Sequence, residues 1–252
     1  MSRNNYHTHT VFCDGQDTPE ALVQYAIAHG CTEIGFSSHS PLDIPDDEPF
    51  SMTQDGAAKY RREVNRLKEA YRDRIRILLG VEQDYFSTSD TSAYDYVIGS
   101  VHYVWKDGCY ICVDFSRDAQ KEAVHNCYHG DFYAFAEDYY ALVGDLCQKT
   151  KCDIIGHFDL ITKFNEGDCL FDTKHPRYVA AYEAALEKLF AQDITFEVNY
   201  GAIARGYRKE PYPAPDILQK ITAAGKRVIY SSDCHRKDML LLGIPEGNVW
   251  KK

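Results

Sequence analysis

The feature that most constrains this fold is a recurring unit, in which a short apolar run of β type precedes polar residues and then a helical pattern. About seven such runs predict strands over Asn4–Thr8, Glu33–Ser37, Ile75–Glu82, Tyr96–Val101, Asp153–Gly156, Ile194–Asn199 and Val228–Ser232. Alternating strands and helices predict a mostly parallel sheet with right-handed crossovers. This number of strands fits either an open doubly wound sheet or a closed barrel.

Helical patterns and end signals separate these runs. Thr18, Pro19 and Glu20 are typical of an N-cap and first turn, and they lead into a helix over Ala21–Ala28 that stops at Gly30. The other predicted helices are Thr53–Arg72, Phe132–Lys149, Tyr178–Gln192 and Pro215–Ala224. The length of 252 residues does not separate one large domain from two small ones, although α/β barrels often use about 250.

Composition argues against several classes of protein. A net charge of -10 disfavours a general nucleic-acid or membrane-surface binder, because such proteins usually carry a basic surplus. The sequence has no apolar run of about 18 residues and no apolar signal segment, so we expect a cytoplasmic protein without a membrane span. Nine irregularly spaced cysteines then predict free thiols, and we interpret Cys109 and Cys112 as incidental rather than as a zinc or redox pair. No glycine-rich phosphate loop is present.

Six of the ten histidines lie at the C-terminal ends of predicted strands. His7 and His9 lie two residues apart, so in a strand their side chains would point to the same face. The carboxyl ends of parallel strands meet on one side of the fold, where active sites form. The side chains gathered there would be His7, His9, Asp14, His39, Glu82, His102, His157, Asp233 and His235. Nine nitrogen and oxygen ligands exceed the four that one zinc needs, so we expect two or three divalent ions, with zinc, manganese or iron favoured.

This ordered set of motifs resembles the polymerase-and-histidinol-phosphatase (PHP) superfamily of metal-dependent phosphoesterases. The matching pieces are His7-Thr-His9 with Asp14, Ser38-His39-Ser40, Gly80-Val-Glu82, Gly99-Ser-Val-His102, Gly156-His157-Phe-Asp159 and Ser232-Asp233-Cys-His235. Each motif is weak alone, but they run in family order along nearly the whole chain. The resemblance implies a distorted (β/α)7 barrel of TIM-like type, with a single domain over residues 1–252.

The resemblance also implies a trinuclear site. One ion would be held by His7, His9, Glu82 and Asp233. A second would be held by Glu82 as a bridge, His102 and His157, and a third by Asp14, His39 and His235. Within this set, we expect Glu82, Asp233 and His235 to be the catalytic residues.

In length and detail, the chain is most similar to the stand-alone histidinol-phosphate phosphatases, which implies a small phosphorylated substrate. The expected reaction is hydrolysis of L-histidinol phosphate by a hydroxide that bridges two metals. Arg205, Lys163 and Arg208 are the candidate phosphate ligands, with Arg205 ranked first. Asp43, Asp46 and Asp47 are candidate partners for the amino group and imidazole of such a substrate. Lys163 stands where the resemblance leads us to expect arginine, and Lys106–His129 matches no motif of the family.

Two other functions are compatible with these motifs. One is a different PHP-type phosphoesterase, such as a nucleotide phosphatase or a phosphodiesterase with nuclease activity. The acidic balance disfavours long nucleic acid, because binding to the phosphate backbone relies on lysine and arginine. The other is a non-catalytic, metal-binding regulatory protein, which the loss of a ligand would favour, but none of the nine expected positions is missing. The sequence does not indicate an oligomeric state.

Overall fold

A six-stranded parallel sheet in the order β1-β2-β3-β6-β7-β8 forms the centre of the computed structural model, which describes residues 2–42, 44 and 50–250. Its strands are β1 Glu33–Phe36, β2 Arg76–Asp84, β3 Tyr96–Ser100, β6 Ile154–Ile155, β7 Thr195–Asn199 and β8 Arg227–Ser231. Each strand overlaps one of the predicted runs, and every neighbouring pair in the sheet is parallel. The predicted parallel α/β architecture is therefore confirmed.

The N-terminal segment joins the two edges of this curled sheet. Asn5 forms an isolated parallel bridge with Ile34 of β1, and Thr8 forms another with Cys234, just after β8. The segment is not a regular strand as predicted, because side chains replace part of its backbone ladder. Ser37 Oγ accepts a hydrogen bond from Thr8 N at 2.9 Å, and Asn5 Oδ1 accepts one from Ser232 N at 3.2 Å. The sheet is thus a half-barrel whose seventh position is filled irregularly.

Alternation along β2 separates an inner face from an outer face. Leu78 packs in a buried cluster with Tyr96 and other inward residues, whereas Ile77 and Leu79 pack in the cluster that includes α1 and α2. Gly80 and Glu82 share the face of Leu78, because side chains two apart in a strand point the same way. A Cβ on Gly80 would lie 2.3 Å from the Tyr96 ring, so only glycine fits there. An apolar layer thus lies beneath Glu82 on the inner face of the half-barrel.

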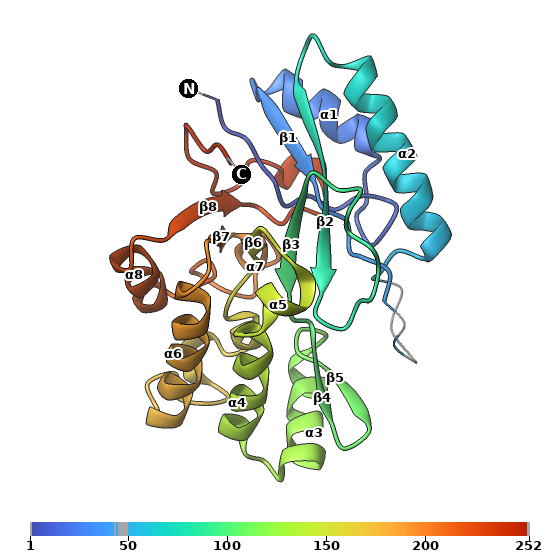
Figure 1. Cartoon of the computed structure of the whole chain (residues 1–252). Coiled ribbons are helices and arrows are strands. Elements are labelled where there is room, and N and C mark those ends of the chain that lie inside the picture. Colours follow the sequence, from blue (N-terminus) through green and yellow to red (C-terminus); the bar gives the residue numbers. More distant parts are fainter. Residues whose placement is uncertain (1, 43, 45–49, 251–252) are drawn as a thin grey trace.

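Helices pack around the outside of the sheet (Figure 1). They are α1 Pro19–Ala28, α2 Gln54–Ala70, α3 Arg117–Tyr128, α4 Phe132–Val143, α5 Leu146–Thr150, α6 Pro176–Phe190, α7 Gly201–Ala204 and α8 Pro215–Ala223. Short 3₁₀ turns cover Leu160–Thr162, Glu166–Asp168 and Lys237–Met239. Helix α2 packs against β2, and α4 packs against α6. None of the described helices is long and apolar enough to cross a membrane.

Two further segments were not predicted as they are observed. The helix expected over Phe132–Lys149 is divided at Gly144 and Asp145 into α4 and α5, because glycine has low helix propensity. The segment Lys106–His129, which matched no motif, contributes to an antiparallel hairpin of β4 Tyr103–Lys106 and β5 Cys109–Cys112, followed by α3.

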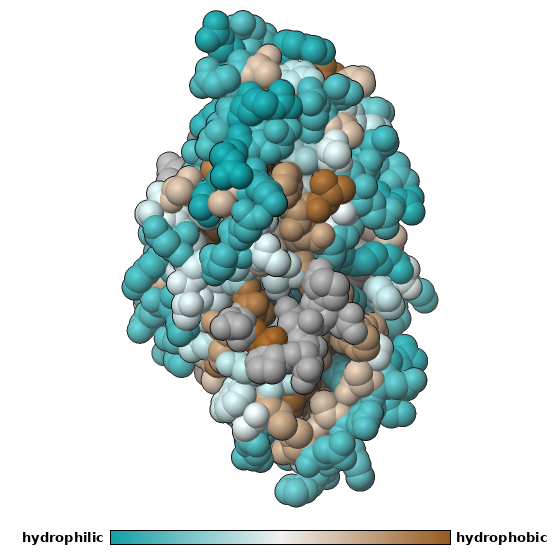
Figure 2. All heavy atoms as spheres, turned by 90° about the vertical axis from the view of Figure 1, so that its right-hand side faces the viewer, coloured by the Kyte–Doolittle hydropathy of each residue, from teal (hydrophilic) through white to brown (hydrophobic). Residues whose placement is uncertain are grey.

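On the face that carries α2, hydrophilic side chains predominate and hydrophobic ones gather near the middle (Figure 2).

Candidate metal centre

All nine side chains predicted as metal ligands lie in one connected cluster at the carboxyl ends of the strands. His7, His9 and Asp14 come from the N-terminal segment, and Glu82 comes from β2. The remaining five follow strands β1, β3, β6 and β8 directly; they are His39, His102, His157, Asp233 and His235. The parallel arrangement of the strands brings together residues from distant parts of the chain.

Glu82 is the centre of this cluster and is buried. Its Oε2 atom lies 3.0 Å from His39 Nδ1, 3.2 Å from His7 Nε2 and 3.5 Å from His9 Nε2. Its Oε1 atom lies 2.9 Å from His157 Nε2 and 3.4 Å from His102 Nε2. Each oxygen therefore faces a different set of imidazoles, as a carboxylate that bridges two ions would require.

The first group of potential ligands consists of His7, His9 and Asp233. His9 Nε2 lies 3.1 Å from Asp233 Oδ1, and His7 Nε2 lies 3.7 Å from the same oxygen. Behind the group, His7 Nδ1 donates to Glu197 Oε1 at 2.5 Å. A carboxylate that accepts from Nδ1 leaves Nε2 free for a metal and fixes the orientation of the ring.

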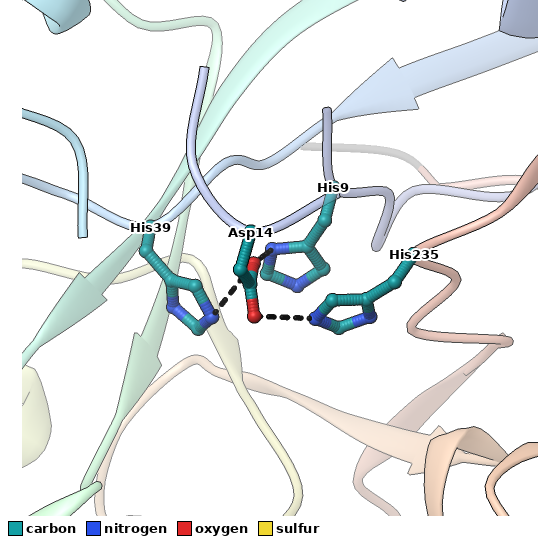
Figure 3. Close-up of side chains that lie close together, drawn as sticks. All are labelled: His9, Asp14, His39 and His235. Carbon is teal, nitrogen blue, oxygen red and sulfur yellow. Dashed lines mark ion pairs between the residues drawn. The ribbon is translucent and has the colours of Figure 1, made fainter. Parts of the chain in front are cut away.

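Three imidazoles converge on Asp14 in the second group (Figure 3). His235 Nε2 lies 3.1 Å from Asp14 Oδ2. His9 Nδ1 and His39 Nε2 lie 3.6 and 3.8 Å from Asp14 Oδ1. This group contains the three residues that the resemblance implies for a third ion, together with His9.

The third group consists of His39, Glu82 and His102, with His157 beside it. His102 Nδ1 donates to Asp84 Oδ2 at 3.1 Å, which again directs Nε2 towards Glu82. Ser100 Oγ donates to Glu82 Oε1 at 2.7 Å and fixes the carboxylate. His39 therefore belongs to both the second and the third group.

Several buried polar atoms of the predicted ligand residues have no hydrogen-bond partner among the described residues. These atoms are His7 Nε2, His9 Nε2, His157 Nδ1, Asp14 Oδ1 and Glu82 Oε2. Buried polar atoms without partners are costly, and natural structures seldom keep them unless a water or an ion completes the site. Their presence within the ligand groups fits divalent cations of the kind that imidazole and carboxylate bind.

The electrostatics of the cluster separate two kinds of histidine. Burial lowers the pKa of His9 to about 3, and the neighbouring imidazoles of His235 and His39 act in the same direction. For His7, burial opposes the charge, but the carboxylates of Glu197 and Glu82 outweigh it and raise the pKa well above its usual value. Burial also opposes ionisation of Glu82, yet the imidazoles of His7 and His39 hold its pKa well below the usual range. Divalent ions would replace the protons that this excess of carboxylates attracts.

A cavity of about 620 Å³ opens onto the cluster. Arg205 and Lys163, both predicted to bind phosphate, line it. Arg205 Nη2 donates to Asp233 Oδ2 at 3.0 Å, and Lys163 Nζ donates to Asp114 Oδ2 at 2.9 Å and to Asp114 O at 2.8 Å. Each cation is thus fixed by an acid and still has N–H groups free to donate.

Arg208 does not line this cavity. Its Nη1 donates to Thr162 Oγ1 at 2.7 Å and lies 3.6 Å from Asp159 Oδ2, while its guanidinium stacks over Tyr212. This position makes Arg208 a buried partner of Asp159. The acidic residues Asp43, Asp46 and Asp47, considered as partners for an amino group of the substrate, lie outside the described residues.

Sequence reasoning missed the carboxylates that support the ligands. Glu197 accepts from His7, from His157 N at 2.8 Å and from Ser231 Oγ at 2.5 Å, and Asp84 accepts from His102. Their spacing in the sequence could have indicated them, because side chains two apart in a strand share a face. Glu197 lies two residues before Asn199, and Asp84 lies two residues after Glu82.

Residues 5–201 match the family model of the PHP domain, which covers more than half of the chain. The chain belongs to the PHP domain family. A Schizosaccharomyces pombe relative named probable histidinol-phosphatase is 30% identical over 254 residues, covering 91% of this chain and 79% of the relative.

Two solved structures share the fold of this PHP domain. A candidate histidinol phosphatase from Listeria monocytogenes superposes with a TM-score of 0.85 at 22% identity, covering 96% of this chain and 98% of the other. A histidinol phosphate phosphatase from Lactococcus lactis, in complex with zinc, L-histidinol and phosphate, superposes with a TM-score of 0.64 at 22% identity. That match covers 94% of this chain and 87% of the other.

Proposed function

We propose that this chain is a metal-dependent phosphomonoesterase that hydrolyses L-histidinol phosphate to L-histidinol and phosphate. The observation that carries the proposal is Glu82, whose two oxygens face five imidazoles within 3.5 Å at the base of a cavity that Arg205 and Lys163 also line. The family membership and the relative named as a histidinol-phosphatase support the same reaction and substrate.

The ligand groups are suited to two or three divalent ions. Zinc is the favoured metal, because the related Lactococcus lactis structure contains it. His7, His9, Glu82 and Asp233 would hold one ion, Glu82, His102 and His157 a second, and Asp14, His39 and His235 a third. When bound, such ions lower the pKa of water and offset negative charge on phosphate oxygens. Glu82, Asp233 and His235 are in this proposal the residues on which the chemistry depends most.

Protein side chains would orient the phosphate against this centre. Arg205 has a fixed position, because Asp233 accepts from Nη2 and His235 Nδ1 lies 3.1 Å from Nη1. The remaining N–H groups of the guanidinium can donate to phosphate oxygens, and Lys163 can donate its remaining N–H from another side of the cavity. These contacts would stabilise the charge that develops on the phosphate during hydrolysis.

The test is phosphate release from a panel of phosphomonoesters that includes L-histidinol phosphate, measured with zinc- and manganese-loaded protein and after chelation. We expect the highest kcat/KM for L-histidinol phosphate and loss of activity on chelation, with recovery when metal is restored. A metal-loaded protein that releases no phosphate from any monoester would overturn the proposal. Equal activity on phosphodiesters would instead support the broader class of PHP phosphoesterases.

A further inference from the structure

The cavity is larger than a phosphate group needs, so part of its wall must face the organic half of a phosphomonoester. Part of this wall comes from the end of β5 and the residues that follow it. Cys112, Asp114 and Phe115 of this segment all line the cavity. The segment belongs to the stretch that matched no motif of the family, so its side chains are candidates for selecting the substrate.

Among the described residues, five carboxylates line the cavity, and four of them belong to the ligand groups or support a ligand. Asp14, Glu82 and Asp233 belong to the ligand groups. Asp84 Oδ2 accepts from His102 N and Nδ1 at 3.0 and 3.1 Å, and Asp84 Oδ1 accepts from Phe86 N at 2.8 Å. Asp114 is the fifth of the carboxylates that line the described part of this cavity.

Asp114 has one oxygen that is only weakly engaged. Oδ2 accepts from Lys163 Nζ at 2.9 Å, whereas the contact found at Oδ1 is the Cys112 thiol at 3.5 Å. A thiol is a weak donor, and an ionised carboxylate can accept several hydrogen bonds. Oδ1 is therefore available to a strong cationic donor in the cavity.

We propose that Asp114 determines specificity by accepting a hydrogen bond from the ammonium group of the substrate, an inference that rests on the proposed function. Lys163 and Asp114 place a positive and a negative group next to each other on one wall. A substrate that carries both phosphate and ammonium complements this pair, with Lys163 on the phosphate side. Hydrogen bonds between charged groups are stronger than neutral ones, so this contact can discriminate between related phosphomonoesters.

The residue after Asp114 supplies an apolar surface for the rest of the substrate. Phe115 is 52% exposed, and its ring packs edge-on against Phe50 with the centroids 6.4 Å apart. Both rings line the cavity. Aromatic faces and edges attract other rings, so this pair suits an imidazole attached to the carbon chain that carries the ammonium group.

The test compares Asp114→Asn with the unchanged protein on two substrates, L-histidinol phosphate and the analogue that lacks its amino group. We expect kcat/KM for L-histidinol phosphate to fall about 10- to 100-fold, mainly through KM, and kcat/KM for the analogue to change less than about threefold. The analogue carries the same phosphate and imidazole, so it accounts for any effect of the lost partner on Lys163. Asp118→Asn, an exposed acid on α3 that does not line the cavity, is the control for net charge and should leave both values unchanged.

Equal losses on both substrates, or no loss on either, would overturn the role of Asp114 while leaving the proposed function intact. If the unchanged, metal-loaded protein hydrolyses p-nitrophenyl phosphate but neither imidazole substrate, both the inference and the proposed substrate are wrong.

Phe115→Ala provides a second measurement. It should raise KM for both imidazole substrates and leave glycerol phosphate unaffected.

Discussion

Glu82 is the residue on which the integrity of the metal centre depends most. Both oxygens face ring nitrogens, and no other carboxylate of the cluster contacts all three ligand groups. Glu82→Gln keeps the shape but replaces one oxygen with an N–H₂ donor that cannot bind a cation. Because bound metals contribute several kcal/mol to catalysis, we expect kcat to fall at least about 100-fold and the metal content to fall with it. Elemental analysis and phosphate release measure both. A variant with full metal content and full activity would contradict this assignment.

Glu197 acts through His7 rather than on the substrate. Glu197→Gln preserves size but weakens the acceptor that fixes His7 Nδ1, and it also disturbs contacts to His157 and Ser231. Loss of such supporting contacts typically costs 10- to 100-fold in metal affinity or activity, so we expect about that reduction. Competition with a chelator measures the metal affinity. Glu187→Gln, on the exposed face of α6, is the matched control and should behave like the unchanged protein.

The two arginines of the loop after β7 are expected to have different roles. Arg205→Met should lower kcat/KM by roughly 100-fold, because it removes a charged donor from the cavity, while the folded state is retained. Arg208→Met should instead lower the free energy of unfolding by about 3 kcal/mol, because Asp159 would lose its cation in a buried position. Steady-state kinetics and urea unfolding of both variants separate these outcomes. A large kinetic effect without destabilisation in Arg208→Met would return it to the phosphate site.

At the scale of elements, strand positions were predictable because buried parallel strands are short apolar runs with clear ends. The β4–β5 hairpin was missed, although Asp107 and Gly108 at its turn both have positive φ and form a strong hairpin signal. Four of the ligand histidines were predictable because they follow strands, and His7 and His9 were predictable because they lie two residues apart in an extended segment. Glu197 and Asp114 were not, because their importance depends on which side chains other strands and the hairpin bring beside them. Arg208 follows the same strand as Arg205, and only the packing of the loop separates them.

The closure of the ring by the N-terminal segment depends on Asn5. Its Nδ2 donates to Ser232 Oγ at 2.7 Å and its Oδ1 accepts from Ser232 N, so one side chain joins the segment to the end of β8. Asn5→Ala leaves buried groups without partners and should lower the free energy of unfolding by about 1–3 kcal/mol. Urea unfolding with excess metal and after chelation should show the same loss. Asn126→Ala, on the exposed face of α3, should have little effect. A loss seen only with metal present would mean that Asn5 acts through metal affinity instead.

For the whole molecule, metal binding and stability are linked through the buried histidines. Carboxylates outweigh the effect of burial and raise the pKa values of His7, His39 and His102 in the metal-free chain. A raised pKa in the folded state stabilises the fold below the unfolded pKa of about 6.5, and that contribution is lost as the pH rises through the folded pKa. His9, with a pKa of about 3, acts in the opposite sense, but only below about pH 6.5.

The chelated protein should therefore become less stable as the pH rises above about 6.5, by about 1.4 kcal/mol per pH unit for each proton that only the folded chain retains. The metal-loaded protein should show the reverse trend, because its ligands bind metal only when deprotonated and protons compete less at higher pH. Thermal unfolding of both forms from pH 6 to pH 9 tests this difference in sign, and proton release on adding zinc measures the same linkage directly. If both forms lost stability in parallel, or if zinc bound without releasing protons, the ligand histidines would not be the groups that couple metal binding to the fold.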